Sequence, residues 1–360
     1  VDGVMTVSAG AAAANAGTVQ NTSSTSFYNR GTFDNRGVFT NTGKLENAGT
    51  FTNGAGGALD NRAGTLSNTG AMSVSAASTF VPGAAFTNTG GYTTDDTAVK
   101  AMKLETATGR VLSLDCGPGE GWQAGCTLRL YGGAGAPFSL PATVDVAGAT
   151  LDLNGRQATA FGSGALSVAA GAALTIRDDT GGGRLTATLD GGAAVANNGS
   201  LTLLGGRVEN TGSTGAAIEN AGALILEGGT AAGYFGVRST AGAVTLSGAR
   251  IEGTGGVAVT GGDLTVTGGG ITATAFPAIQ FGSDGRLEIS GGAVTADEKD
   301  TVVLTRGEAV ISGGVITKSV RNSIEYAVKL ETGARLDFTG GTIRAPEAAS
   351  LWHDANDPTL

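Results

Sequence analysis

Residues 264–271 read Leu-Thr-Val-Thr-Gly-Gly-Gly-Ile, and residues 287–294 repeat this pattern as Leu-Glu-Ile-Ser-Gly-Gly-Ala-Val. Residues 201–208, Leu-Thr-Leu-Leu-Gly-Gly-Arg-Val, follow the same rule: apolar-x-apolar, one spacer, a glycine pair, another spacer and a final apolar residue. Because side chains alternate along a strand, the two apolar residues lie on one face and Thr265 between them lies on the other. The unit is therefore a short strand that ends in a glycine corner.

This unit recurs along the second half of the chain. Its copies begin at Leu151, Leu174, Leu201, Leu224, Val244, Leu264, Leu287, Ala309 and Leu336. Further short apolar segments lie between these starts, such as residues 257–259 and 279–281, so each repeat holds about three strands. Coils stacked roughly 4.8 Å apart would align the inward aliphatic residues in columns. The sequence therefore predicts an all-β fold, a right-handed parallel β-helix with about three short strands per coil.

A second repeat, Asn-x-Gly-x-apolar, occupies residues 29–72. Its asparagines, six residues apart, are Asn29, Asn35, Asn41, Asn47 and Asn53. Six residues fit one short strand and a tight corner, so three such units would close one coil. We expect the asparagines and glycines to supply the positive-φ positions of these corners. The hand of this segment stays open, because a six-residue step also suits a left-handed coil.

Breaks in the two repeats divide the chain into four segments. Residues 1–93 form an N-terminal β-solenoid segment, and residues 143–345 form the main β-helix. Residues 94–142 form an irregular joint, within which residues 98–107 are expected to be a short helix or coil. Residues 346–360 form a C-terminal tail or cap.

Composition excludes several classes of protein. The 360 residues include 63 glycines, only 7 prolines and 41% apolar residues, which excludes collagen and a disordered chain. The net charge of −9 and the absence of a basic patch argue against a nucleic-acid partner. No apolar run approaches the roughly 18 to 20 residues of a transmembrane segment.

Cys116 and Cys126 are the only cysteines, and residues 117–122 between them are rich in turn-forming residues. The two sulfur atoms can therefore meet, and we interpret them as a disulfide worth about 2 to 3 kcal/mol. The alternative is two unrelated thiols. A disulfide would place the protein in an oxidising compartment outside the cytoplasm.

Together, the Asn-x-Gly-x-apolar run and the strand-Gly-Gly units resemble the β-helical shafts of bacterial surface and secreted proteins, including autotransporter passengers and filamentous-haemagglutinin-like adhesins. Residues 150–155, Thr-Leu-Asp-Leu-Asn-Gly, followed by residues 173–181, look like the opening coils of such proteins. The resemblance implies an extracellular or cell-surface structural protein, a shaft, adhesin or fibre subunit. Its expected partners are host or surface glycans and further copies of itself.

Parallel β-helices also include pectin lyases, polygalacturonases and phage tailspike hydrolases, so a carbohydrate-active enzyme is the alternative. Glycoside hydrolysis needs two carboxyl groups that face one sugar. Asp178 and Asp179 are adjacent and point to opposite sides of an extended chain. Asp297, Glu298 and Asp300 are expected to form a solvated corner.

The remaining chemistry is sparse. The only histidine, His353, lies in the tail, and one histidine with two cysteines cannot supply a zinc cluster. We therefore assign no catalytic residue, no metal site and no cofactor, and we expect no enzyme.

A flat threonine face would suit ice binding. The expected outward column reads Asp152, Thr175, Thr202, Ile225, Thr245, Thr265, Glu288, Val310 and Asp337. Charged and bulky residues interrupt the threonines, which argues against this function.

The ends of the solenoid carry the candidate subunit contacts. Residues 4–7, Val-Met-Thr-Val, already alternate like a coil strand, and no capping segment precedes them in this sequence. In one interpretation the tail folds back as a cap. In the other, the first coil of one subunit pairs with the last coil of another and builds a filament. Val4, Met5, Val7 and Trp352 would then lie at the contact.

Overall fold

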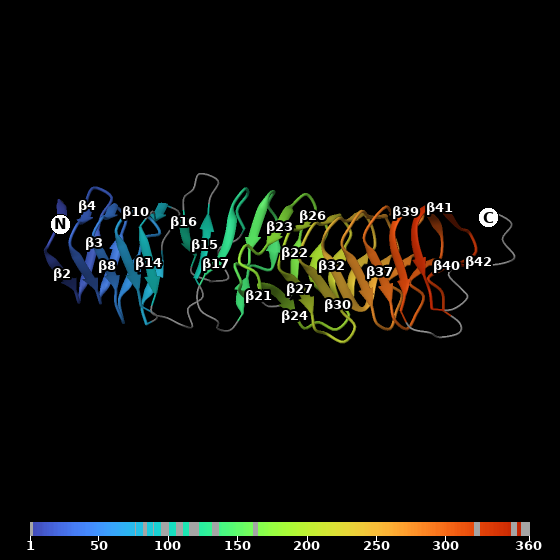
Figure 1. The fold of residues 1–360 in the computed structure, drawn as a ribbon. Helices are drawn as coiled ribbons and strands as arrows, with labels where there is room; N and C mark the ends of the chain where they lie inside the picture. The colour runs from blue at the N-terminus through green and yellow to red at the C-terminus, as the bar shows by residue number, and fades with distance from the viewer. Residues whose placement is uncertain are drawn as a thin grey trace. The chain divides into compact units, whose positions relative to one another are not determined.

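The computed structural model describes residues 3–75, 77–81, 85–88, 90–94, 101–105, 111–114, 122–131, 137–160, 165–319, 325–346 and 351–353. These residues form strands and turns without a helix, and most of the strands stack in parallel coils (Figure 1). The predicted all-β parallel solenoid is therefore confirmed. The chain divides into two compact units, Val1–Glu120 with Gly125–Phe138, and Gly121–Ala124 with Ser139–Leu360.

Three parallel sheets build the solenoid of the first unit. The first sheet contains, in order, β1 (Val4–Val7), β4 (Ser26–Asn29), β7 (Lys44–Asn47), β10 (Thr65–Asn68) and β13 (Ala85–Asn88). The second contains β2 (Ala12–Asn15), β5 (Thr32–Asn35), β8 (Thr50–Asn53), β11 (Ala71–Val74) and β14 (Gly91–Thr94). The third contains β3 (Thr18–Asn21), β6 (Val38–Asn41), β9 (Ala58–Asp60) and β12 (Thr79–Val81). Each coil thus contributes one strand to each sheet, as the six-residue step predicts.

Aromatic rings fill the centre of this solenoid. The apolar residue of each six-residue unit points inward, and Phe27, Phe33 and Phe39 are at most 1% exposed. These three rings come from consecutive strands and meet edge to face, with centroids 4.9, 5.2 and 5.9 Å apart. This is the arrangement that aromatic quadrupoles favour. One coil is therefore closed around three phenyl rings.

Buried asparagines form ladders at the corners. The three ladders are Asn15–Asn35–Asn53, Asn29–Asn47–Asn68 and Asn21–Asn41–Asn61. Asn35 shows the rule: its side-chain Nδ2 donates to Asn53 Oδ1 at 2.7 Å and to the Ala58 carbonyl oxygen at 3.1 Å, both in the next coil. Burial of an amide is costly unless its polar atoms are bonded. In each ladder, the buried side-chain amides of one coil therefore form their hydrogen bonds with atoms of the next coil.

The prediction of positive φ is wrong for these asparagines and for most of the glycines, and among the described glycines of residues 29–72 only Gly56, with a φ of 77°, fits it. Among the described non-glycine residues only Asn154 has a positive φ, and the corner glycines Gly43 and Gly49 have none. The glycines are needed because neighbouring backbones approach closely. A Cβ atom on Gly49 would lie 2.1 Å from the Gly31 carbonyl oxygen, and one on Gly43 would lie 2.0 Å from that of Thr22.

Antiparallel strands occupy part of the predicted joint. β15 (Ala101–Glu105) pairs antiparallel with β16 (Val111–Leu114) and with β17 (Thr127–Tyr131). The expectation of a helix or coil at 98–107 is therefore wrong for the strand residues. Cys126 is buried in the core of the first unit. Cys116 lies outside the described residues, so the disulfide stays a prediction.

The main solenoid has three faces, and β18 (Phe138–Leu140) precedes it in the chain. The first face contains β20 (Ala149–Asp152), β23 (Ala173–Arg177), β26 (Ser200–Leu203), β29 (Ala223–Leu226), β31 (Ala243–Leu246), β33 (Asp263–Val266), β36 (Arg286–Ile289) and the first parts of β39 (Gly307–Lys318) and β41 (Ala334–Arg344). The second contains β21 (Gln157–Ala160), β24 (Arg184–Ala187), β27 (Arg207–Asn210), the first parts of β30 (Thr230–Ser239) and β32 (Arg250–Val259), β34 (Gly270–Ala273), β37 (Ala293–Ala296) and the second parts of β39 and β41.

The third face contains β19 (Thr143–Val144), β22 (Leu166–Val168), β25 (Ala193–Asn197), β28 (Ala216–Asn220), the second parts of β30 and β32, β35 (Ile279–Phe281), β38 (Val302–Leu304), β40 (Val328–Leu330) and β42 (Leu351–His353). Aliphatic side chains from all three faces fill the interior. Leu264, Ile271 and Ile279, one from each face, are fully buried.

The first copy of the main repeat begins two residues earlier than predicted. Thr150, not Asp152, pairs with Thr175 and so leads the outward column. The reason lies at the corner, where Asn154 has a φ of 47°. Gly155, the next residue, also has a positive φ of 71°, so this corner is built differently from the glycine pairs of later copies.

The rest of the predicted outward column pairs in the expected order. Its members are Thr175, Thr202, Ile225, Thr245, Thr265, Glu288, Val310 and Asp337. Asp152 is instead fully buried and forms an ion pair with Arg177, whose Nη2 lies 3.3 Å from Asp152 Oδ2. The column remains too irregular for a lattice match.

One ladder ends on an unsatisfied atom, which gives a stability test. Asn29 Oδ1 is buried and has no hydrogen-bond donor within the described part of the chain, because Val7 occupies the paired position in the first coil. At the neighbouring corner Asn15 fills that position and donates to Asn35 Oδ1 at 2.8 Å. We predict that Val7→Asn stabilises the first unit by about 1 kcal/mol.

Thermal and urea unfolding of the full chain measure this effect. Val7→Asp is the matched control, because its carboxylate has the same shape but no proton to donate, and it should destabilise. Equal effects of the two substitutions would show that the Asn29 oxygen is not the cause.

Candidate functional site

The N-terminal end of the first unit exposes apolar strand edges. Strands β1, β2 and β3 stand at the ends of their sheets, so each pairs on one side only among the described strands. Val4 is 69% exposed and Met5 43%, whereas Val7 is 4% exposed and packs in the core. A hollow of about 620 Å³ opens beside them and is lined by residues that include Val19 and Phe27. Of the predicted contact residues, Val4 and Met5 are therefore accessible and Val7 is not.

Part of the predicted tail continues the solenoid. Strand β42 pairs in parallel with β40, with Trp352 in register with Lys329. The sole histidine, His353, belongs to this strand, opposite Leu330. Trp352 thus lies on a strand of the last coil.

Asp178 and Asp179, the first predicted pair of carboxylates, have different surroundings. Asp178 accepts backbone N–H bonds from Gly155 at 2.7 Å and from Gly183 at 2.6 Å, which ties two corners together. Asp179 is half exposed and lies 3.4 Å from Arg177 Nη2. Asp178 has a structural role, and the two do not form a pair that could flank a sugar.

The second predicted group is a solvated corner only in part: Glu298 is exposed, whereas Asp300 is buried at 7% exposure. Asp300 Oδ1 accepts the Tyr326 N–H at 2.5 Å, and the Asp300 carboxyl is hydrogen-bonded to Glu325. Glu325 also accepts from Lys299 Nζ at 2.9 Å. Lys318 is 3% exposed and donates to the Asp297 carbonyl oxygen.

Burial controls the protonation of this cluster. It raises the pKa of Asp300 and lowers the pKa of Lys318. Burial also acts to raise the pKa of Glu325, but hydrogen bonds from Lys299 and Asp300 outweigh it and lower that pKa. The carboxyl groups are therefore driven apart in pKa, yet the low exposure of Asp300 leaves little of it accessible to a substrate.

A groove in the main solenoid brings together charged and aromatic side chains that are more accessible than Asp300. It has a volume of about 520 Å³, and β27, β30 and β32 line it together with the turns that follow β27 and β34. Glu209 pairs with Ala232 and Ala232 with Glu252, so the two glutamates lie two coils apart with a small residue between them. We call this hollow the Arg207 groove.

Arg207 joins the two glutamates. Its Nη2 lies 3.1 Å from Glu209 Oε1, and its Nη1 lies 3.3 Å from Glu252 Oε2. The other oxygen of Glu252 contacts Arg250. Partial burial opposes the charge of Arg207, but the two carboxylates outweigh it and hold the pKa of Arg207 above its usual value. Arg207 lines the groove and Arg250 lies beside it, so these two arginines and the two glutamates together carry no net charge.

Aromatic residues stand beside these charges. Tyr234 lines the groove, and its ring centroid lies 5.4 Å from that of Phe235 and 5.5 Å from that of Phe276. Phe276 is 37% exposed. Arg238 lies over the Phe235 ring, 5.3 Å from its centroid.

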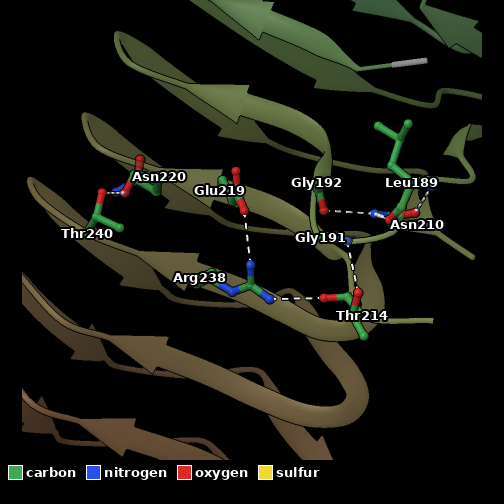
Figure 2. Close-up of polar contacts among 9 residues, drawn as sticks. All are labelled: Leu189, Gly191, Gly192, Asn210, Thr214, Glu219, Asn220, Arg238 and Thr240. Atoms are coloured by element: carbon green, nitrogen blue, oxygen red, sulfur yellow. Dashed lines mark hydrogen bonds and ion pairs between the residues drawn. The ribbon is translucent and has the colours of Figure 1, made fainter. Parts of the chain in front are cut away.

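Polar contacts fix the wall of the groove (Figure 2). Asn210 Nδ2 donates to the carbonyl oxygens of Leu189 and Gly192, both at 3.0 Å. Arg238 reaches Glu219 at 3.1 Å and the Thr214 carbonyl oxygen at 3.0 Å (Figure 2). The turn that carries Thr211 and Ser213 is therefore held from both sides.

Sequence reasoning missed the Arg207 groove. Its members lie up to 67 positions apart (274 − 207), and only the coil register brings them together. The signal available was the adjacent aromatic pair Tyr234-Phe235 in a chain with 5% aromatic residues.

Comparison with known proteins gives no match: no family model, no curated protein and no solved structure is similar enough to be matched. The resemblance to autotransporter passengers and haemagglutinin-like adhesins therefore rests on the repeats alone. None of the described segments forms a helix long and apolar enough to cross a membrane. Within the described ranges, His, Cys, Asp and Glu side chains do not gather in threes where a metal ion would fit.

The buried carboxyl of Asp300 predicts a pH effect. Because its pKa is raised, the folded protein holds this proton to higher pH than the unfolded chain does. Stability is therefore lost as pH rises through the folded pKa of Asp300. Asp300→Asn keeps an acceptor for the Tyr326 N–H and a donor for Glu325. We predict a melting temperature about 1 to 2 °C above wild type at pH 8 and no gain at pH 4.

Scanning calorimetry at the two pH values measures this difference. Asp337→Asn, an exposed residue outside the cluster, should leave both values unchanged. An equal shift of Asp300→Asn at pH 4 and pH 8 would contradict the assignment.

Proposed function

We propose that this chain is an extracellular structural β-solenoid, a surface shaft or the subunit of a head-to-tail filament. The observation that carries the proposal is the coil of β1, β2 and β3, each of which pairs on one side only among the described strands and lies beside exposed Val4 and Met5. An exposed strand edge is a template for another strand. A coil from a second subunit would pair its strands with all three edges at once.

The C-terminal coils of the second unit supply the other surface in this proposal. Strand β42 continues the parallel stacking of β40, and Trp352 lies on that strand. A contact between the last coil of one copy and the first coil of the next uses two different surfaces, so it propagates without closing. Trp352 is the proposed anchor in that contact.

The proposed location outside the cytoplasm rests on the predicted disulfide and on the resemblance of the repeats to bacterial surface shafts. The acidic net charge of −9 supports partners other than nucleic acid. We propose that the protein acts by binding and scaffolding rather than by catalysis.

A carbohydrate-active enzyme is the second candidate, because Glu209 and Glu252 share one groove. A general acid must carry a proton, whereas both glutamates accept hydrogen bonds from Arg207, a role that the carboxylate form fills. This pairing favours binding of a carbohydrate over its cleavage.

Electron microscopy of the full chain over a range of concentrations tests the filament proposal. We predict that filaments form, and that Val4→Asp with Met5→Asp raises the required concentration by about tenfold or more, because a desolvated charge opposes the contact. Val38→Asp is the matched control, since Val38 is 46% exposed on β6 inside the stack and should assemble like wild type.

Isolated particles at every concentration would contradict head-to-tail assembly. So would equal assembly of the double variant and the wild type. Circular dichroism of each variant establishes that the fold is retained.

A further inference from the structure

The Arg207 groove has the shape of a ligand site because glycines replace side chains at its floor. Gly233 and Gly253 lie on neighbouring coils, and a Cβ on Gly253 would lie 2.3 Å from the Gly233 carbonyl oxygen. Backbone therefore forms the floor, while Arg207, Glu209 and Tyr234 rise beside it. Its volume is about 520 Å³, and it is open to solvent along the surface rather than enclosed.

The aromatic side of the groove offers a flat apolar surface. Tyr234 is only partly buried, and Phe235 and Phe276 support it at centroid distances of 5.4 and 5.5 Å. The backbone N–H of Tyr234 donates to the Gly215 carbonyl oxygen at 2.9 Å. Clustered aromatic residues at a surface mark binding sites. One face of a pyranose ring carries C–H groups and can stack on such a surface.

The polar side of the groove matches sugar hydroxyl groups. Glu209 and Glu252 accept hydrogen bonds and Arg207 donates them, while Thr254 and Thr274 add hydroxyl groups. A polyol can donate to the carboxylates and accept from the guanidinium. An anionic ligand would meet the two glutamates, and a cationic ligand would meet the arginines. Charge balance therefore favours a neutral ligand.

The groove is already formed without a ligand. Asp190 Oδ1 accepts from the backbone N–H of Ser213 at 2.6 Å and from its hydroxyl at 2.9 Å. Arg238 holds the neighbouring Thr214 carbonyl oxygen (Figure 2). A preformed wall reduces the ordering cost of binding.

We propose that the Arg207 groove binds a neutral oligosaccharide, with one sugar ring on Tyr234 and its hydroxyl groups on Glu209, Glu252 and Arg207. This inference deepens the proposed function, since it gives a surface protein a defined glycan site on the side of its solenoid. Both groove carboxyl groups are paired with Arg207, which favours binding over cleavage.

Isothermal titration of the full chain with maltohexaose, cellohexaose, mannohexaose and N-acetylchitohexaose tests the proposal. We expect at least one of these neutral probes to bind with a Kd between about 10 μM and 1 mM. Tyr234→Ala should weaken that binding about tenfold or more, and Tyr234→Trp should retain it. Tyr28→Ala, on β4 of the first unit, is the matched control and should bind like wild type.

Several results would overturn the inference: no binding by any of the four probes, equal binding by Tyr234→Ala, tighter binding of oligogalacturonate or chitosan hexamers, or release of reducing ends. Electron microscopy of Tyr234→Ala separates the two proposals. Loss of sugar binding in Tyr234→Ala with filaments intact is the expected result. Sugar binding by a wild-type chain that forms no filaments would contradict assembly alone.

Discussion

The register between neighbouring coils is the constraint on which the whole structure depends. Each strand pairs with the equivalent strand of the next coil, so like residues stack on like residues. In the first unit this places Asn35 against Asn53 and Phe33 against Phe51. The hydrogen bond from Asn35 Nδ2 to Asn53 Oδ1, at 2.7 Å, and the packing of the two phenyl rings both require that register. A shift of one residue would turn every inward side chain outward.

Close stacking also explains why so many glycines are needed at the corners. At Gly49 the limiting contact is the carbonyl oxygen of the coil below, not an unusual φ. In the main solenoid the second glycine of the pair, such as Gly206, does have a positive φ. The first glycine of the pair meets the same limit as Gly49, since a Cβ on Gly268 would lie 2.1 Å from the Ser247 carbonyl oxygen.

The repeats predicted the parallel fold, the strand faces and most of the outward column, since periodicity alone determines these. They did not predict the amide ladders, because a six-residue spacing does not say whether Asn35 turns its corner or bonds to the next coil. The burial of Asp300 was missed for a similar reason: its partners Tyr326 and Glu325 come from the following coil. The Arg207 groove depends on contacts across 45 positions, which only the three-dimensional register supplies.

The two proposed functions, assembly and glycan binding, use different surfaces of the coils. The first coil presents strand edges that suit another coil, whereas the Arg207 groove lies on the side, where several coils contribute one or a few residues each. Assembly through the ends would leave the groove accessible and would repeat it along a filament. Multiple weak sites on one filament give a higher avidity than any single site.

Hydrogen exchange in the Asn47→Ala variant tests the central claim most directly, because Asn47 accepts from Asn29 at 2.6 Å and donates to the Ala71 carbonyl oxygen at 2.9 Å. A loss of about 2 kcal/mol predicts roughly thirtyfold faster exchange of the backbone amides in β4, β7 and β10. Thr52→Ala, an outward residue of β8, should change these rates less than about threefold. Unchanged exchange in Asn47→Ala would contradict the claim that the amide ladders hold the coils in register.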